Sequence, residues 1–279
     1  MSEIRNISKF SQIIDPSALA CEHMQVPLFC EFDNRLFIFA VLFDENGPTQ
    51  NILRKLERLV ERIDNPDKQN TCVLFVAKYS SQDKVVDAAK APVKLVYSRR
   101  LRGSGFRYYK TNESNNSISA GIRWFTKNTP GVRPMKAFQQ SSFVNIPEDF
   151  SPAAPVFDFS GLKEKSGVRM ATDVDLLLSI NDEDFIVCEF KDGDAPMPRG
   201  QQLAFERLSR AARVPTIHFS HHTSGEPSEK VHAEAATAKS AYFPRNGVWG
   251  WYPPTSRWTM ARVVSQATRG LLPPLVSCR

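Results

Sequence analysis

Two carboxylates and a lysine at the ends of neighbouring apolar runs are the residues of this chain best suited to chemistry. Asp175 directly precedes the run Leu176–Leu178, and Glu189 and Lys191 close the run that begins at Phe185. Alternation along a strand puts Glu189 and Lys191 on one face. Asp175 and Glu189 offer the hard oxygen ligands that Mg²⁺ or Mn²⁺ prefers, and Lys191 can position a water molecule or offset transition-state charge. This combination predicts metal-assisted hydrolysis of a phosphodiester.

The register of the two strands decides whether Asp175 and Glu189 meet. Opposed residues of an antiparallel pair share a face, so Asp175 lies opposite Glu189 only if the connection has an odd number of residues, three or five. A four-residue connection would put Asp175 opposite Phe190 and separate the carboxylates. Asp173 has the same parity as Asp175 and stays an alternative, with pairing geometry favouring Asp175.

The elements that must position these residues follow one another closely. Residues 174–180 and 185–191 are predicted strands around a polar turn, a helix is predicted over 199–213, and residues 214–222 form a third strand. On that helix Gln201 shares a stripe with Phe205, whereas Gln202 falls on the polar face. We therefore expect Gln201 to point towards the sheet.

The pattern Asp-x(13)-Glu-x-Lys on a hairpin, followed by a helix and a strand, resembles the PD-(D/E)xK nuclease superfamily over about residues 168–222. In this resemblance Asp175 is the motif aspartate, Glu189 the second acid and Lys191 the lysine. Gly200-Gln201 is similar to the glutamine element that many members carry at the start of the helix. The proline that often precedes the aspartate is absent here.

The resemblance implies a restriction-endonuclease-like core that uses Mg²⁺ or Mn²⁺, bound by Asp175 and Glu189, to hydrolyse nucleic acid, with Lys191 and Gln201 completing the catalytic set. A second interpretation from a different class stays open. The chain would then be a non-catalytic nucleic-acid-binding or assembly protein with a degenerate nuclease fold. DNA and RNA are not distinguished as substrates, and the oligomeric state is not indicated.

The chain as a whole is predicted to be an α/β protein with a mixed sheet flanked by helices. A proline-bearing polar stretch at 145–155 suggests a boundary near residue 150, between an N-terminal α/β domain (1–150) and the nuclease-like domain (151–279). The N-terminal region contains predicted strands at 27–32, 35–43, 72–79 and 93–98 and an apolar helical stripe at 52–63. Its β-β-α-β order matches the second region. We do not favour a duplication, because this order is common and the first region has no comparable acidic cluster.

Positive charge is concentrated between residues 94 and 136. The chain carries +6 in total, and this segment alone carries +9, interleaved with aromatic residues. Such a segment suits a polyanion whose bases stack on aromatic rings, and a solvated basic loop is the competing interpretation. The residues expected to bind phosphates are Arg99, Arg100, Arg102, Arg107 and Lys110.

Several other features narrow the function. His218, His221 and His222 match no zinc spacing and are interpreted as a strand-end cluster. Residues 246–254 and 257–264 are predicted to be short strands with an Asn-Gly turn. The longest apolar run, Leu36–Phe43, is too short to cross a membrane, and the first residues do not resemble a signal peptide. Five scattered cysteines encode neither a disulfide framework nor a zinc site, so we expect a cytoplasmic protein.

Overall fold

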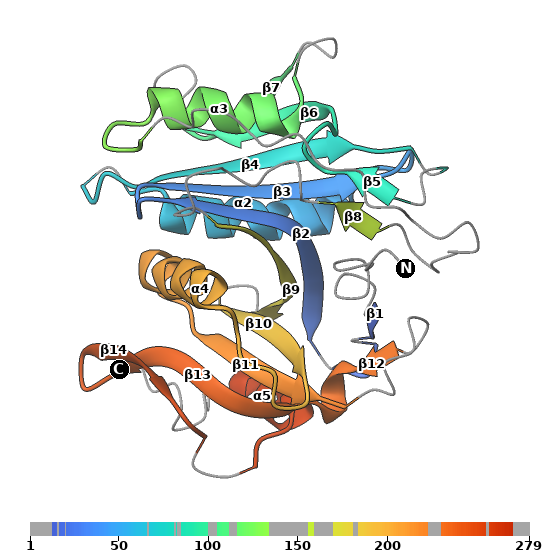
Figure 1. The fold of residues 1–279 in the computed structure, drawn as a ribbon, viewed down its shortest axis with the longest axis vertical. Helices are drawn as coiled ribbons and strands as arrows, with labels where there is room; N and C mark the ends of the chain where they lie inside the picture. The colour runs from blue at the N-terminus through green and yellow to red at the C-terminus, as the bar shows by residue number, and fades with distance from the viewer. Residues whose placement is uncertain are drawn as a thin grey trace, which may run out of the picture. The chain divides into compact units, whose positions relative to one another are not determined.

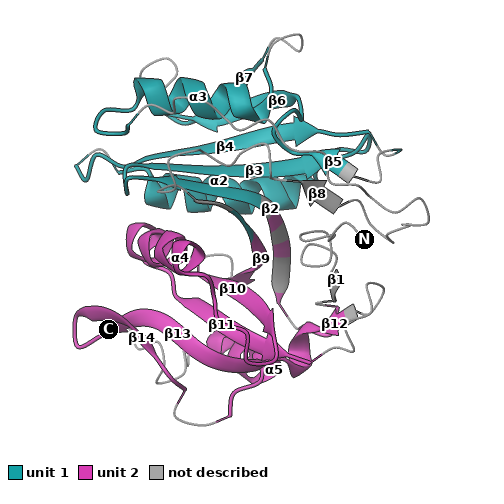
Figure 2. Cartoon of the chain, viewed as in Figure 1, with its two compact units in different colours: residues 1–11, 27–173 teal, residues 12–26, 174–279 magenta. Residues whose placement is uncertain are grey.

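The structure is a computed structural model in which two units are distinguished by contacts between α-carbons (Figure 1 and Figure 2). Unit 1 comprises residues 1–11 and 27–173, and unit 2 comprises residues 12–26 and 174–279. The predicted boundary near residue 150 lies outside the described residues. The described residues are 13–15, 17–19, 21–65, 67–80, 82, 85–99, 105–111, 116–133, 156–158, 170–180, 184–222, 230–254 and 257–269.

Unit 1 is built on a mixed sheet in the order β2-β3-β4-β6-β7. β3 and β4 are parallel, and the other neighbouring pairs are antiparallel. A separate parallel pair joins β5 to β8. The elements are β2 (Glu22–Phe32, of which residues from Pro27 belong to unit 1), β3 (Leu36–Phe43), α2 (Gln50–Ile63), β4 (Thr71–Lys78), β5 (Val85–Asp87), β6 (Val93–Ser98), β7 (Arg107–Lys110), α3 (Ile118–Asn128) and β8 (Val156–Asp158).

Local sequence explains the first hairpin and helix of unit 1. Asp33 and Asn34 adopt left-handed backbone angles, with φ of 51° and 54°, a conformation that Asp and Asn tolerate better than most residues. The N-cap of helix α2 is Thr49, whose hydroxyl oxygen accepts a hydrogen bond from the backbone nitrogen of Ile52 at 3.4 Å. The hairpin and the helix were both predicted, and both are confirmed.

Two helices cover the sheet of unit 1 on opposite faces (Figure 1). Ile118, Ile122 and Phe125 of α3 join one buried cluster with Ile38 and Phe75 of the sheet. On the other side, α2 buries its apolar stripe, which consists of Leu56, Leu59, Val60 and Ile63.

Unit 2 has a mixed sheet in the order β9-β10-β11-β13-β14. β10 and β11 are parallel, and the other neighbouring pairs are antiparallel. A separate parallel pair joins β1 to β12. The elements are β1 (Ile13–Asp15), β9 (Met170–Ile180, of which residues from Val174 belong to unit 2), β10 (Asp184–Asp192), α4 (Arg199–Ala212), β11 (Thr216–His221), β12 (Lys230–His232), the short 3-10 helix η2 (Ala233–Ala235), β13 (Thr237–Arg245), β14 (Val248–Tyr252) and α5 (Met260–Thr268).

The two helices of unit 2 also lie on opposite faces of its sheet. Met260 and Val264 of α5 share a buried cluster with Ile186 and Phe219 of the sheet. α4 packs on the other face, where Ser209 forms a 2.7 Å hydroxyl–hydroxyl hydrogen bond with Thr216 of β11. The α4 face is the face on which Glu189 lies, because Gln201 of α4 contacts it.

The expected α/β class with a mixed sheet flanked by helices is confirmed. No helix among the described residues is long and apolar enough to span a membrane. The prediction of a strand at 257–264 is wrong, because α5 begins at Met260 with Thr259 as its N-cap. Part of the basic segment 94–136 forms a hairpin, in which β7 pairs with β6.

Candidate metal-dependent active site

The register of β9 and β10 is the one that brings the two acids together. The ladder runs from Ile180 opposite Asp184 to Leu176 opposite Cys188, across a three-residue connection. The next position in this register places Asp175 opposite Glu189. Beyond the ladder, Asp175 Oδ2 accepts a hydrogen bond of 2.7 Å from the backbone nitrogen of Phe190. The strands predicted from the sequence, 174–180 and 185–191, leave a four-residue connection, but β10 begins one residue earlier, at Asp184. The connection is therefore odd, which is the condition for Asp175 to lie opposite Glu189.

Glu189 is the most enclosed charged group of this site. Its side chain is 0% exposed, and its Oε1 accepts a 2.7 Å hydrogen bond from Gln201 Nε2. The Lys191 ammonium group forms an ion pair with the same oxygen. A buried carboxylate is tolerated only when hydrogen bonds and an opposite charge compensate for lost solvation, and Gln201 and Lys191 provide both.

The start of α4 delivers Gln201 to this carboxylate. Gln201 is in the first turn of the helix and is buried with Phe205 and Leu208, while Gln202 is half-buried. The apolar stripe of the helix therefore turns Gln201 towards the sheet, as predicted. The positive end of the helix dipole lies at this first turn and favours the negative charge of Glu189. The turn contains no acidic residue that would offset this effect.

The parallel strand β11 brings a residue that the sequence analysis did not assign to the site. His218 is the register partner of Glu189, and Ser220 is the partner of Lys191. Burial lowers the pKa of His218 to about 4, and the charges of Lys191 and Lys239 act in the same direction. His218 is therefore a neutral imidazole near pH 7. The signal that could have found it is the β-α-β order, which makes β10 and β11 parallel neighbours.

The two candidate aspartates make different contacts. Asp173 accepts a 3.4 Å hydrogen bond from the adjacent Thr172 hydroxyl, whereas Asp175 reaches the backbone of β10 next to Glu189. These contacts favour Asp175 over Asp173 as the acid that lies beside Glu189.

The donor set fits a magnesium-like cation better than a softer metal. Among the described residues no group of three or more His, Cys, Asp or Glu side chains is arranged to hold a metal ion. Mg²⁺ is commonly bound by one or two protein carboxylates, with water and substrate phosphate completing its shell. Asp175 and Glu189 supply such a pair.

Unit 2 has a pocket of about 490 Å³, whose lining contains none of Asp175, Glu189, Lys191 and Gln201. Its wall includes Ser220, the register partner of Lys191, and the Ser220 hydroxyl donates a 2.5 Å hydrogen bond to the Gly193 carbonyl. The pocket has no acidic side chain in its lining, which includes the basic or imidazole residues His221, His222, His232, Lys239 and Arg257.

The five predicted phosphate-binding residues of the 94–136 segment are only partly described. Arg100 and Arg102 lie outside the described residues. Arg99 is committed to an internal contact, because it forms a 2.6 Å ion pair with the buried carboxylate of Asp64.

Arg107 and Lys110 are exposed on β7. The Arg107 guanidinium lies 5.6 Å from the Tyr109 ring centroid, a basic and aromatic pair on the outer hairpin of unit 1.

Comparison with protein-family models, curated proteins and solved structures finds no match to this chain.

Proposed function

We propose that the chain is a divalent-metal-dependent nuclease, with unit 2 as a restriction-endonuclease-like domain of the PD-(D/E)xK type. The observation that carries the proposal is the fully buried Glu189 carboxylate, held by Gln201 and Lys191 and placed beside Asp175 by the strand register. A carboxylate removed from water costs several kcal/mol before its partners compensate. Binding of a divalent cation would explain why a carboxylate is kept at this buried position.

Each side chain of the site has a distinct role. Asp175 and Glu189 would hold Mg²⁺ or Mn²⁺, which when bound polarises the scissile phosphate and acidifies a water molecule. Gln201 orients Glu189 through its hydrogen bond to Oε1. Lys191, whose side chain is 24% exposed, faces both Glu189 and solvent. It would position the attacking water or offset charge that develops on the phosphate oxygens.

The nucleic-acid chain would extend from this centre over basic surface. The pocket at the end of β11, which Ser220 lines, presents Arg257 and Lys239, the latter ion-paired with Asp194 at 2.6 Å, and these cations suit the phosphate next to the scissile one. Arg107 and Lys110 on the β7 strand of unit 1, with Arg100 and Arg102, remain the proposed phosphate-binding residues of the basic segment. Arg99 is no longer among them, because its guanidinium forms an ion pair with Asp64. Phosphate contacts of this kind bind DNA and RNA alike.

A cytoplasmic location is part of the proposal. Cys30, Cys72 and Cys188 are buried free thiols, and burial raises the pKa of each of them above the usual range. Such thiols are compatible with a reducing compartment.

The rival function is a non-catalytic nucleic-acid-binding or assembly protein in which the Lys191–Glu189 ion pair is only structural. A cleavage assay distinguishes the two functions. It uses labelled circular and linear DNA and RNA, incubated with Mg²⁺, with Mn²⁺ or with a chelator. We expect metal-dependent cleavage by the wild type and at least about a 1,000-fold loss in Glu189→Gln, since metal assistance contributes several kcal/mol.

Asp184→Asn is the matched control, because Asp184 is an exposed acid at the opposite end of the same strand. It should cleave like the wild type. Binding without cleavage by the wild type on every substrate, or equal cleavage by Glu189→Gln and Asp184→Asn, would favour the rival function. Thermal melting checks that both variants fold.

A further inference from the structure

The order of elements along the chain is the same in two successive halves. Among the described elements, the first half runs β1-β2-β3-α2-β4-β5-β6-β7-α3, and the second runs β8-β9-β10-α4-β11-β12-η2-β13-β14-α5, so that the short 3-10 helix η2 alone has no counterpart in the first half. Equivalent strand pairs have the same sense: an antiparallel hairpin, a parallel pair across the helix, then two antiparallel pairs. Both hairpins have a three-residue connection.

An irregularity of the sheet recurs at the same place. The ladder between β4 and β6 shifts at Val76/Ala77, and the ladder between β11 and β13 shifts at His218/Phe219. On β4 and on β11, the residue that lies two positions before the last paired residue ahead of the shift is opposite a tyrosine of the neighbouring strand. These pairs are Leu74 with Tyr97 and Thr216 with Tyr242. A bulge is a local feature that unrelated sheets have no reason to share at one position.

The two tyrosines also have the same surroundings. The Tyr97 ring lies 5.5 Å from Phe106 and 4.8 Å from Tyr108, and the Tyr242 ring lies 5.5 Å from Trp249 and 5.3 Å from Trp251. The Tyr97 hydroxyl donates to Glu61, and the Tyr242 hydroxyl accepts from Arg210 at 2.6 Å. Glu61 and Arg210 both stand two residues before the end of their helices, α2 and α4.

The last helix of each half is attached by the same pair of backbone hydrogen bonds. In the first half, Val93 N donates to Asn116 O at 2.7 Å and Ile118 N donates to Ala91 O at 3.0 Å. In the second half, the corresponding bonds run from Ala238 N to Trp258 O at 2.8 Å and from Met260 N to Ala236 O at 2.9 Å. The N-caps Ser117 and Thr259 are equivalent.

The first strands of the halves are exchanged between the units. β1 belongs to the first half but pairs with β12 in unit 2, and β8 belongs to the second half but pairs with β5 in unit 1. Each pairing is parallel and joins three residues. Reciprocal exchange of an equivalent element is the arrangement known from domain swapping, here within one chain.

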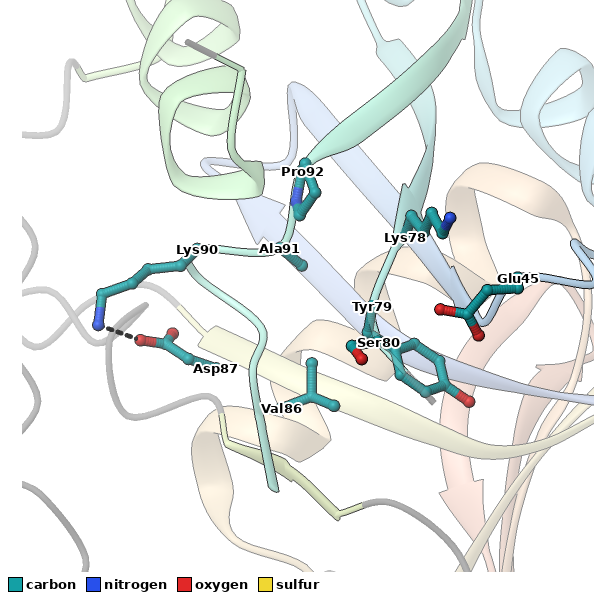
Figure 3. A pocket seen from close by; sticks show the side chains of 9 residues that line it. All are labelled: Glu45, Lys78, Tyr79, Ser80, Val86, Asp87, Lys90, Ala91 and Pro92. Carbon is teal, nitrogen blue, oxygen red and sulfur yellow. Dashed lines mark ion pairs between the residues drawn. The ribbon is translucent and has the colours of Figure 1, made fainter. Parts of the chain in front are cut away.

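The pockets correspond as well. The pocket of unit 1, about 420 Å³, lies at the end of β4 and around β5 (Figure 3). It is lined by Glu45, Lys78, Tyr79, Ser80, Val86, Asp87, Lys90, Ala91 and Pro92. The pocket of unit 2 is lined by the residues at the same places after β11 and around β12.

Unit 1 has apolar residues at the positions that correspond to the four proposed site residues of unit 2. The correspondence follows from the positions of the residues within the equivalent strands and helices. Glu189 is the sixth residue of β10 and Lys191 the eighth, and the corresponding residues of β3 are Val41 and Phe43. Asp175 stands five residues before the end of β9, where β2 has Pro27. Gln201 is the third residue of α4, where α2 has Ile52.

We propose that unit 1 is a copy of the unit 2 fold that has lost its reaction centre, so that the chain has one metal centre for two copies of the fold. The step that assigns chemistry to unit 2 depends on the proposed function. The four residues at the equivalent positions in unit 1 provide no carboxylate, amide or ammonium group, and apolar side chains cannot replace the hydration shell of a divalent cation. Unit 1 is thereby available for binding alone.

Titration of Mn²⁺ into the full chain, followed by the loss of its free-ion electron paramagnetic resonance signal, tests this. We expect Glu189→Gln to lose all specific Mn²⁺ binding and Glu45→Gln, which removes a carboxylate from the unit 1 pocket, to lose none. Circular dichroism melting confirms that each variant folds.

A specific Mn²⁺ site that survives Glu189→Gln and disappears in Glu45→Gln would place a metal centre in unit 1 and overturn the inference. A wild-type chain that binds no Mn²⁺ would instead contradict the proposed function, and with it the single centre. The two failures therefore give different titration curves.

Discussion

Units 1 and 2 have the same order of strands and helices. At the corresponding strand end, however, unit 2 has charged residues and unit 1 has apolar residues. In unit 2, β10 ends in the buried Glu189 and the partly exposed Lys191, whereas in unit 1, β3 has the apolar Val41 and Phe43 at the corresponding places. The fold is therefore compatible with either set. What distinguishes the units is a handful of positions that face one strand end, and function belongs to those positions rather than to the architecture.

The pockets repeat this difference in their charges. In unit 1, Asp87 and Glu45 accompany Lys78 and Lys90, and Lys90 is already ion-paired with Asp87 at 2.8 Å (Figure 3). In unit 2 the lining has no acid and includes Lys239 and Arg257. Lys239 is itself ion-paired with Asp194 at 2.6 Å, outside the lining, so the pockets differ in the acids that line them and in Arg257. A lining without acids is better suited to an anion, which is consistent with a phosphate-bearing substrate.

Replacing the lysine of the site should have the largest effect of the variants that leave both carboxylates in place. We expect Lys191→Met to reduce the cleavage rate by about 100-fold, because the transition-state charge loses its cation, while Mn²⁺ binding persists. Single-turnover cleavage and Mn²⁺ titration measure the two properties separately. Cleavage at the wild-type rate would remove Lys191 from the chemistry.

Making one position of unit 2 resemble unit 1 should have a smaller effect. Gln201→Ile introduces the residue that α2 has at its third position, and it removes the hydrogen bond that orients Glu189. We expect about a tenfold fall in kcat with KM for the nucleic acid unchanged, since substrate contacts are elsewhere. Gln202→Ile, one residue further on, is the matched control and should behave like the wild type. An equal fall in both variants would indicate a general effect of the helix.

The two pockets can be compared with one charge removed from each. Arg257→Gln in unit 2 should weaken binding of a labelled oligonucleotide about threefold at 0.1 M salt, whereas Lys90→Gln in unit 1 should leave it unchanged. Measurement in Ca²⁺ or in a Glu189→Gln background keeps the oligonucleotide intact. Equal weakening by both variants would mean that the pockets do not differ in anion binding.

The outer hairpin of unit 1 should contribute a modest, sequence-independent component of affinity. Arg107→Gln with Lys110→Gln removes two exposed charges and spares Arg99, whose ion pair with Asp64 is structural. The slope of log affinity against log salt should flatten by roughly 0.7 to 0.9 for each phosphate that the double variant no longer neutralises. Cleavage at saturating substrate should not change. An unaltered slope would support the solvated-loop interpretation of this segment.

Local signals predicted much of what positions the site. The Asp33-Asn34 pair predicted the first hairpin, and the stripe containing Gln201 and Phe205 predicted which glutamine faces the sheet. The parity argument stated which connection lengths bring Asp175 opposite Glu189, but the sequence did not predict the length itself, because the predicted second strand began at Phe185 and β10 begins at Asp184.

What escaped prediction depends on contacts between distant parts of the chain. His218 becomes a neighbour of Glu189 only through the parallel pairing across α4, and β1 pairs with β12 more than 200 residues later. The duplication was not favoured because Val41 and Phe43 carry no trace of the acidic cluster, although the fold around them persists. The sequence predicted a strand in place of α5 because its short apolar pattern fits both a strand and a helix. The N-cap residue Thr259 is the sequence signal that indicates the start of the helix.

The central claim is that the fold of unit 2, and not that of unit 1, brings two carboxylates to one divalent cation. A crystal structure of the chain with Mn²⁺, in which the ion is located by its anomalous scattering, tests this most directly. The account predicts manganese between Asp175 and Glu189, with metal–oxygen distances of about 2.0 to 2.2 Å, and none at Val41 and Phe43. Manganese bound elsewhere in the chain, with the space between Asp175 and Glu189 holding no metal at saturating Mn²⁺, would contradict it.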